Sequence, residues 1–571
     1  MFGAVHSQDD WIIISPMNKK VVAIGLDAAP PKLLNEWMMQ GLLPNLQSLR
    51  MGGAYAPLTN LDYFKAETPW TTFLTGCMPQ KTGYWGPVKL QSGTYEIEEI
   101  GAYDFQPYAP FYALGDRYRV AAFDVPQSTL SDRVNGIQVL GWGAHSPQTP
   151  SYSKPEHLFA QIQNQHGEHP ALHKDHGSWW DCAYINRLHQ SLLEGLKRRV
   201  DICRSLLRQE EWDLFLTIFG ETHSAGHDLW HLSQPQHPVY PYRAEGMPQG
   251  DPMLDVFQAA DDALGKILAE TTDDTSIVVF SGHGSGDNST DVMSMLFLPE
   301  FLYRFNFAGA MMFVPDELSV DAPPLVASAR DQGWSEDIWE RRYVRNPVER
   351  LLRSHLPKKF HRYINRLFAG DGRLATSQQL KRQGQAYYWQ PAMWFKPFWP
   401  QMRAFALPSF SEGYIRINLA GREPNGLVNP ESYDQLCAEL TEQLYLLVNP
   451  RTGKPVVDKV ILTRAAADDR DDRLPDADLV VKWNDVAVDV VEHPQLGRIG
   501  PVPYRRTGSH RAQGFMIAKG PGIEPGSTLS AGHCVDLAPT ILDLMGAPIP
   551  DHLDGKSLVK ASRHAHAANA V

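Results

Sequence analysis

Short apolar runs that are followed at once by polar residues recur along the chain. Three of them cover residues 21–26, 214–219 and 276–280. Continuous apolar runs of this length are typical of parallel strands that helices cover on both faces. The polar residues that follow the three runs include Asp27, Glu221, His223, His227 and His283. We expect these residues to lie at or just beyond the carboxyl ends of buried strands.

Segments with helical spacing separate these runs. Residues 31–53 and 251–270 place apolar side chains three or four positions apart, as the buried face of an amphipathic helix requires. A further helix is expected to begin at a capping Asp536 and to end at Gly546. The alternation predicts an α/β fold with a doubly wound, mostly parallel central sheet flanked by helices. In such sheets the carboxyl ends of the strands form the ligand-binding edge.

Two stretches break this pattern and are predicted to be insertions. Residues 88–175 are rich in Tyr, Pro and Gly, and residues 300–405 contain a basic segment and an aromatic cluster. The α/β core is therefore expected to comprise residues 18–300 and 405–560, with the smaller insertion inside its first part. Residues 561–571 lack a repeating apolar face and are expected to form a frayed tail.

The basic segment and the aromatic cluster each allow two interpretations. The aromatic cluster, residues 387–400, reads YYWQPAMWFKPFWP. It forms either the wall of a substrate pocket or the core that attaches the insertion. The basic segment, residues 341–366, is either a solvated amphipathic cap helix or a surface that meets an anionic substrate or lipid head group. The sequence favours the solvated helix.

Composition limits the partners and the compartment. The formal net charge of −12 argues against general nucleic-acid binding, which needs clustered basic charge. The five cysteines, an odd number without a C-x-x-C pair, indicate reduced thiols in a cytoplasmic protein. Residues 11–14 are apolar but follow two aspartates, so we expect no secretory signal. No segment supplies the roughly 20 apolar residues of a transmembrane helix.

Imidazole and carboxylate groups predominate among the residues at predicted strand ends. His510, which precedes another predicted strand near the C-terminus, joins those named above. Such groups suit Zn²⁺ and related divalent metals, and a doubly wound sheet would gather them at one edge. Their common placement therefore predicts a metal site. Asp228, His231 and Asp287 are interpreted as solvated loop residues rather than as replacement ligands.

Ordered motifs make the chain similar to a known family. They include AIGLDAAPP at residues 23–31, FKAETPWTTFLTGCMPQKTGYWG at 64–86, HSAGH at 223–227, FSGHG at 280–284 and GSHRAQGFMIAKGPGI at 508–523. With these motifs the chain resembles the alkaline phosphatase superfamily. Within it, the chain is similar to the type I phosphodiesterase and nucleotide pyrophosphatase branch and to bacterial phosphomutase-like members. The resemblance covers most of the chain outside the two insertions.

The resemblance implies a reaction and a set of site residues. Its enzymes act on phosphorus with two metal ions, commonly zinc, that flank a Thr or Ser nucleophile. Carried over residue by residue, the resemblance assigns Asp27 and His283 to one metal and His227 and His510 to the other. Thr68 would be the nucleophile and a metal ligand, at a helix start that favours an anion.

Two departures from the family pattern affect the nucleophile and the first metal. Ala66 occupies the usual position of the nucleophile, so Thr68 serves only if the loop is shortened. Gly282 replaces an aspartate ligand, which weakens or removes the metal at Asp27 and His283.

A third departure affects the second metal. His223 replaces another aspartate of the family, and Glu221 stands nearby as a substitute ligand. One Zn²⁺ held by His223, His227 and His510 is therefore an alternative to two ions. Mn²⁺ or another divalent metal is also compatible with these ligands.

The predicted activity is metal-dependent hydrolysis or transfer on a small-molecule phosphodiester, phosphomonoester or nucleotide pyrophosphate. Two alternatives stay open. One is a mononuclear metal enzyme that tailors a small metabolite or cleaves a sulfate or phosphonate ester, although the chain lacks the Cys-x-Pro-x-Arg segment of ordinary sulfatases. The other is a degenerate member that binds a ligand without turnover. Neither the substrate nor the oligomeric state follows from the sequence.

Overall fold

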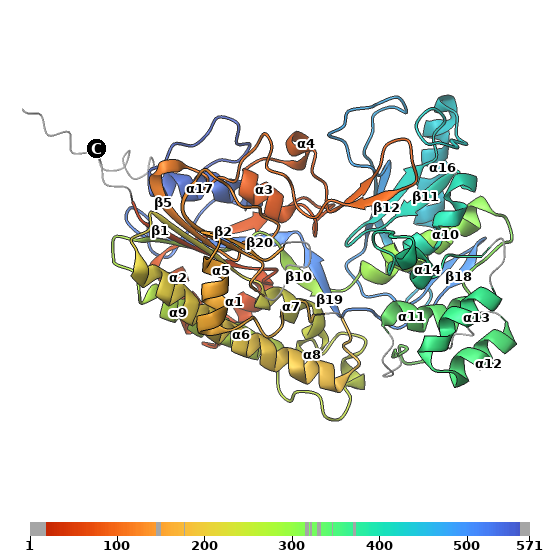
Figure 1. The fold of residues 1–571 in the computed structure, drawn as a ribbon, viewed down its shortest axis with the longest axis horizontal. Coiled ribbons are helices and arrows are strands. Elements are labelled where there is room, and N and C mark those ends of the chain that lie inside the picture. The colour runs from red at the N-terminus through yellow and green to blue at the C-terminus, as the bar shows by residue number, and fades with distance from the viewer. Residues whose placement is uncertain are drawn as a thin grey trace, which may run out of the picture.

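The computed structural model describes residues 19–143, 150–175, 177–314, 319, 322–327, 333–344, 346–368 and 373–559. The N-terminal apolar stretch and the predicted tail, residues 561–571, lie outside the described residues. Figure 1 shows two neighbouring parts, one built around a large sheet and one built from short helices and small sheets. None of the helices within the described ranges combines the length and the apolar character needed to span a bilayer.

A central sheet organises the larger part and confirms the predicted doubly wound α/β fold. In spatial order its strands are β21 (Ser527–Thr528), β2 (Ala54–Thr59), β20 (Gln513–Lys519), β9 (Ser276–Ser281), β1 (Val21–Leu26), β8 (Leu214–Phe219), β5 (Gly115–Phe123), β6 (Val134–Leu140) and β7 (Tyr152–Lys154), and β22 (Gly532–His533) also pairs with β2. β1 lies parallel to β8 and β9, and β5 lies parallel to β8 and β6. β20 is antiparallel to both of its neighbours. The sheet is therefore mostly parallel.

Helices cover both faces of the sheet (Figure 1). One face carries α1 (Pro31–Met39), α2 (Pro44–Gly52), α5 (Leu158–His166), α6 (Cys182–Gln209) and α9 (Pro252–Leu268), and the other carries α3 (Pro69–Thr75) and α17 (Leu537–Met545). Side chains of β1 alternate between the two layers. Val22 and Ile24 belong to the buried cluster that contains the apolar face of α9, and Val21 and Ala23 belong to the cluster that contains α17. Burial on both faces explains why this strand is apolar throughout.

Helix α17, which lies on one face of the central sheet, confirms the prediction at its C-terminal end but not at its N-terminal end. Gly546 ends the helix in the left-handed conformation, as expected. Asp536 stands at the N-cap, but its side chain does not cap α17. It accepts hydrogen bonds from the backbone of His533 and Lys556 instead, at 2.8 and 2.7 Å.

The predicted domain boundaries need correction. Residues 88–175 form a hairpin of β3 (Val88–Leu90) and β4 (Ile97–Glu99), but they also supply β5, β6 and β7 to the central sheet. These strands escaped prediction because exposed or half-buried polar residues interrupt their apolar runs. The range 405–560 is also divided, since the central sheet receives only β20, β21 and β22 from it. The rest of that range, up to β18 (Gly497–Ile499), belongs to the smaller part.

The smaller part combines two sheets with short helices. One sheet has the order β11 (Ala404–Leu407), β12 (Gly413–Ile417), β16 (Leu479–Trp483), β15 (Val457–Leu462), and the other has the order β14 (Lys454–Pro455), β13 (Val448–Asn449), β17 (Val491–His493), β18. The helices are α10 (Leu298–Asn306), α11 (Trp334–Ile338), α12 (Pro347–His355), α13 (His361–Leu367), α14 (Ser377–Arg382), α15 (Pro391–Trp394) and α16 (Tyr433–Tyr445). Their core contains the second half of the aromatic cluster, Trp394, Phe395, Phe398 and Trp399. This half therefore attaches the insertion, as one of the two interpretations proposed.

Candidate metal centre

Three neighbouring strands of the central sheet deliver polar side chains to one edge. Asp27 follows β1, and His283 follows β9. β8 leads into α7 (Glu221–Asp228), on which His223 and His227 stand four residues apart and so share a face. His510 comes from β19 (Gly508–Arg511), which pairs with β10 (Gly284–Asp287) directly after His283. The sheet topology thus brings together four histidines and one aspartate.

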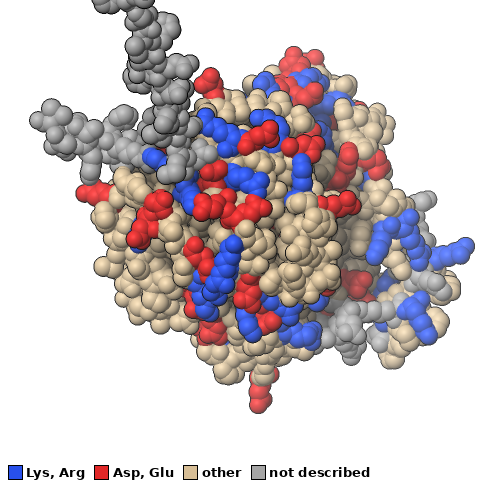
Figure 2. All heavy atoms as spheres, turned by 60° about the vertical axis from the view of Figure 1, so that its left-hand side comes forward, with Lys and Arg blue, Asp and Glu red and all other residues tan. Residues whose placement is uncertain are grey.

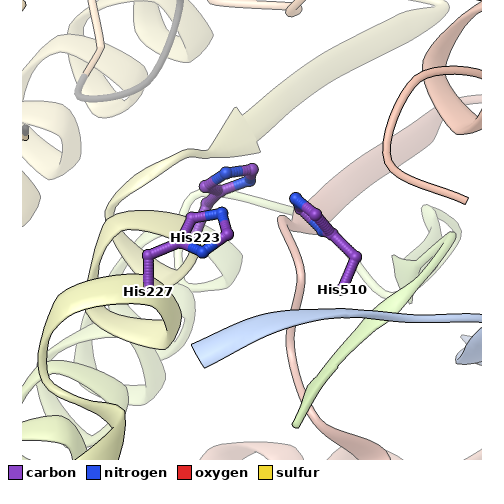
Figure 3. A group of neighbouring side chains, drawn as sticks. All are labelled: His223, His227 and His510. Carbon is purple, nitrogen blue, oxygen red and sulfur yellow. The ribbon is translucent and has the colours of Figure 1, made fainter. Parts of the chain in front are cut away.

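These five side chains form two overlapping groups that could hold a cation. In the first, one ligand atom from each of His223, His227 and His510 lies within 4.8 Å of the other two. The second group, Asp27, His223 and His283, meets the same distance. Figure 3 shows the three imidazoles of the first group facing one another across a small space. Because His223 belongs to both groups, the geometry is compatible with one ion at the first group or with a second ion beside Asp27.

Hydrogen bonds fix the orientation of two imidazoles. The Nδ1 atom of His223 lies 3.0 Å from Oδ2 of Asp27, and Nδ1 of His227 lies 2.7 Å from the carbonyl oxygen of Gly508. Both acceptors require a proton on Nδ1, which places the ring lone pair on Nε2. A carboxylate or carbonyl behind the ring is the usual support of a metal-binding histidine. The protein therefore presents both rings in the tautomer that binds a metal.

The surroundings of His510 favour its uncharged form. All five side chains are buried. Burial, and after it the neighbouring His283, His223 and His227, holds the pKa of His510 well below its usual range. A neutral imidazole is the form that coordinates metals. Three histidines suit Zn²⁺ with a fourth position left for water or substrate, so the residues present fit a divalent cation.

Thr68, the predicted nucleophile, is absent from the lining of the cavity over this centre. It stands at the N-cap of α3, its side chain is fully buried, and its hydroxyl donates to the carbonyl oxygen of Phe64 at 2.9 Å. A cavity of about 570 Å³ opens over the histidines. From the Thr68 loop, Ala66 and Glu67 line this cavity, whereas Thr68 does not. The nucleophilic role of Thr68 stays a prediction from the family resemblance.

Glu221, the predicted substitute ligand, also points elsewhere. Its carboxylate binds Arg199 of α6 at 2.9 Å and His169 at 3.1 Å. Burial alone would raise the pKa of Glu221, but Arg199 and His169 lower it to about 2. Among the described residues, neither ligand group includes Glu221. The side chain anchors the first turn of α7 on α6 and so positions the helix that carries His223 and His227.

Asp228, His231 and Asp287 are not ligands in this arrangement. Asp228 accepts a hydrogen bond from Tyr184, His231 contacts the Thr507 hydroxyl at 3.1 Å, and Asp287 accepts from Trp230 at 2.7 Å. Asp228 and His231 are buried and held within the protein, not solvated as we expected. Their interactions support α7 and the helix after it, α8 (Trp230–Ser233).

The first half of the aromatic cluster lines the cavity, as the other interpretation proposed. Tyr387, Tyr388 and Trp389 contribute to its wall together with Phe410. Tyr387 meets Phe410 edge to face, with ring centroids 5.5 Å apart. The cluster therefore has two roles, because its second half is buried in the smaller part and its first half faces the histidines.

Two arginines of the cavity were missed by the sequence analysis. Arg506 forms two hydrogen bonds to the carboxylate of Asp291, at 2.8 and 3.0 Å. Arg505 lies 4.4 Å above the ring of Trp389, and its Asp291 contact is longer, at 3.9 Å. The next residue, Thr507, donates its backbone N–H to the carbonyl oxygen of His227 at 3.1 Å. One residue separates the pair from the GSH motif that contains His510, and this closeness was the available sequence signal.

Glu67 is a third cavity residue that the sequence did not single out. It accepts hydrogen bonds from the hydroxyls of Ser411 and Tyr414, at 2.7 and 3.0 Å, and from the backbone of Phe410. Burial, and after it the nearby carboxylate of Glu412, raises the pKa of Glu67 to about 7. Its position beside Ala66 in the predicted nucleophile loop was the only signal in the sequence.

The doubly wound fold thus carries a histidine centre at its ligand-binding edge, where the residues fit a divalent cation. The model of the type I phosphodiesterase / nucleotide pyrophosphatase family matches residues 21–314, more than half of the chain. The chain therefore belongs to this family of phosphoric ester hydrolases, which depends on divalent metals. The resemblance inferred from the motifs is confirmed.

Two solved structures are similar over most of the chain. Phosphonoacetate hydrolase from Sinorhizobium meliloti 1021, in complex with phosphonoformate, is 13% identical with a TM-score of 0.43, over 93% of this chain and 96% of that chain. An inactive variant of murine ectonucleotide pyrophosphatase / phosphodiesterase 5, in complex with AMP, is 11% identical with a TM-score of 0.43, over 94% and 96%. No curated protein matches the chain.

Proposed function

We propose that the protein hydrolyses a small-molecule phosphate ester at a centre that holds one divalent cation, with His223, His227 and His510 as ligands. The contact between Asp27 and Nδ1 of His223 carries this proposal. It gives Asp27 the role of orienting a ligand, and Gly282 supplies no carboxylate for a second ion. Zn²⁺ is the metal that three histidines suit best. Two ions, with Asp27 and His283 binding the second, are the alternative that metal analysis distinguishes.

A bound divalent cation would polarise a phosphoryl oxygen and lower the pKa of the attacking group. The protein supplies the remaining functions. Arg505 presents guanidinium N–H groups to the cavity and can bind an oxyanion. Tyr387, Tyr388 and Trp389 provide an apolar wall for the organic part of the substrate. This combination suits an anionic ester with an apolar or planar organic group.

Water is the nucleophile that the cavity supports best. The family position of the nucleophile holds Ala66, which lines the cavity without a hydroxyl. Thr68 remains the side-chain candidate from the resemblance, and it would have to exchange its bond to Phe64 for a place in the cavity. The two nucleophiles are distinguished by whether a covalent intermediate forms. Attack by Thr68 passes through a phosphothreonine, whereas attack by water forms no covalent intermediate.

The proposal is tested with purified protein loaded with Zn²⁺ or Mn²⁺. Metal content is measured per chain, and hydrolysis is followed with bis-p-nitrophenyl phosphate and with nucleotide pyrophosphates. We expect one tightly bound metal and metal-dependent turnover that H227A abolishes. H493A is the control, because His493 lies in β17, outside both ligand groups. Turnover that survives both chelation and H227A would contradict the proposed centre.

A binding protein without turnover is the second candidate. The presence of Ala66 and Gly282 at two family positions favours it. It predicts that inorganic phosphate binds at the centre while no ester in a broad screen is hydrolysed at any metal loading.

The cytoplasmic location and the identity of the metal remain predictions. The five cysteines are all free thiols in the structure.

A further inference from the structure

The basic segment, residues 341–366, stands out against the charge of the whole protein. It contains nine Lys and Arg residues and a single Glu, in a chain with a net charge of −12. Its helices α12 and α13 lie at the edge of the smaller part, away from the central sheet (Figure 1). In Figure 2, Lys and Arg side chains gather at the right-hand edge, the side on which these helices lie in Figure 1.

The same helices expose large apolar side chains. Leu351, Tyr363 and Leu367 are 60%, 54% and 72% exposed. Three further exposed apolar residues between positions 348 and 360 are Val348, Leu356 and Phe360. Tyr363 and Leu367 are four residues apart in α13 and so share a face. Isolated apolar residues are common on surfaces, but six within twenty residues form a patch that indicates a binding surface.

An acid outside the segment pairs with one of its basic side chains, since Asp337 binds Arg341 at 2.7 Å. Glu349, the one acid of the segment, is buried and binds Arg353 at 2.7 Å. Arg350 donates to the carbonyl oxygen of Val344, an uncharged partner. Lys359 lies 5.3 Å from the ring of Phe360. The surface of α12 and α13 therefore combines exposed apolar groups with an excess of positive charge.

We propose that α12 and α13 dock the protein on a membrane surface that contains anionic lipids. Leu351, Tyr363 and Leu367 would enter the boundary between head groups and acyl chains, and the basic side chains would contact lipid phosphates. Anionic membranes complement the positive charge, and each basic residue near such a surface strengthens binding about fivefold. A nucleic acid would match the charge but leaves the exposed leucines unexplained. This inference is independent of the proposed hydrolytic activity.

The test is sedimentation of the full-length protein with lipid vesicles. We expect binding to vesicles of phosphatidylcholine and phosphatidylserine that weakens with added salt, and little binding to phosphatidylcholine alone. L351S/L367S and R350E/R366E should each lower the apparent affinity by more than tenfold. Matched controls are M39S/L462S and K32E/K454E, which change exposed residues of the same kinds elsewhere. Circular dichroism checks that every variant is folded.

Three results would overturn the inference. One is wild-type protein that does not sediment with the anionic vesicles. Another is an L351S/L367S variant that sediments with the vesicles as well as the wild type does, because the proposal requires these leucines to enter the membrane. A third is retention on duplex DNA without vesicle binding, which would assign the basic surface to a polyanion.

Discussion

The Nδ1 atom of His223 lies 3.0 Å from the Asp27 carboxylate, so the two residues act as a pair at the end of neighbouring strands β1 and β8. The family resemblance assigns both positions to metal ligands, with the expected aspartate at Asp27 and a histidine in place of aspartate at His223. Asp27 then serves His223 as the orienting acceptor that metal-binding histidines commonly have.

Loss of the Asp27 carboxylate should weaken metal binding, although it removes no ligand of the first group. For D27N we expect a fall in zinc affinity of about 10- to 100-fold, the usual effect of removing a supporting carboxylate. Competition with a chromogenic chelator measures it. D287N is the control, because Asp287 binds Trp230 instead of a ligand histidine. Complete loss of zinc in D27N, with the fold intact, would show that Asp27 is itself an essential ligand.

Restoring a carboxylate at position 282 should create a second metal site. A Cβ atom at Gly282 would meet only the Cβ of Cys534, at 3.6 Å, which is an ordinary contact. G282D therefore fits and places a carboxylate beside Asp27 and His283. We expect metal content to rise from one to two ions per chain, measured by mass spectrometry of the metals. G282N adds a side chain of similar volume without charge, and its metal content should stay at one ion per chain.

Removal of the Thr68 hydroxyl distinguishes the two nucleophiles. Because this hydroxyl donates to Phe64 and lies outside the cavity lining, T68A should keep kcat within a few-fold of the wild type. If Thr68 is the nucleophile, its removal should lower kcat on the order of 10⁴-fold or more. Rapid quenching with a radiolabelled phosphodiester is the second measurement, and a trapped phosphothreonine would establish Thr68 attack.

Arg505 should control affinity for the anionic substrate. Its guanidinium lies 3.9 Å from the Asp291 carboxylate, beyond hydrogen-bond distance, and 4.4 Å over the ring of Trp389. R505M should raise KM, or the Kd of inorganic phosphate, on the order of 10- to 100-fold, as loss of a charge-assisted hydrogen bond does. R505K keeps the charge but not the planar fork and should be intermediate. R498M is the control, because Arg498 forms a surface ion pair with Glu492, and it should change neither KM nor Kd. Equal phosphate affinity in R505M and the wild type would refute the role of Arg505 in binding the anion.

Glu67 should make stability depend on pH. Its pKa is raised to about 7 in the folded protein, so the folded state binds the proton more tightly than the unfolded chain. The free energy of unfolding should therefore fall as pH rises from the ordinary carboxyl range toward 7. E67Q should flatten this part of the curve in urea titrations, whereas E431Q, at an exposed glutamate, should not. An unchanged slope in E67Q would contradict the raised pKa.

Much of the fold and part of the site could be predicted because they depend on local sequence. The apolar runs of β1, β8 and β9 identify the strands, and strand ends locate Asp27 and His283. The strands β5 and β6 could not be recognised, because exposed or half-buried polar residues interrupt their apolar runs.

Side-chain direction could not be predicted in the same way. Glu221 was expected at the metal, but Arg199, on another element, holds it. The contact of Arg505 with Trp389 joins residues more than a hundred positions apart in the chain. Such contacts follow from how the smaller part packs on the sheet, and no periodicity or motif records them.

The backbone hydrogen bond from Thr507 to His227 has a consequence for ligand binding. It ties the segment with Arg505 and Arg506 to the helix that presents two of the histidines. The proposed cation and oxyanion sites thus share one support, and ordering that support for either ligand would lower the entropic penalty for the other. The cation and the oxyanion should therefore bind cooperatively. By thermodynamic reciprocity, each should raise the affinity of the protein for the other by the same factor.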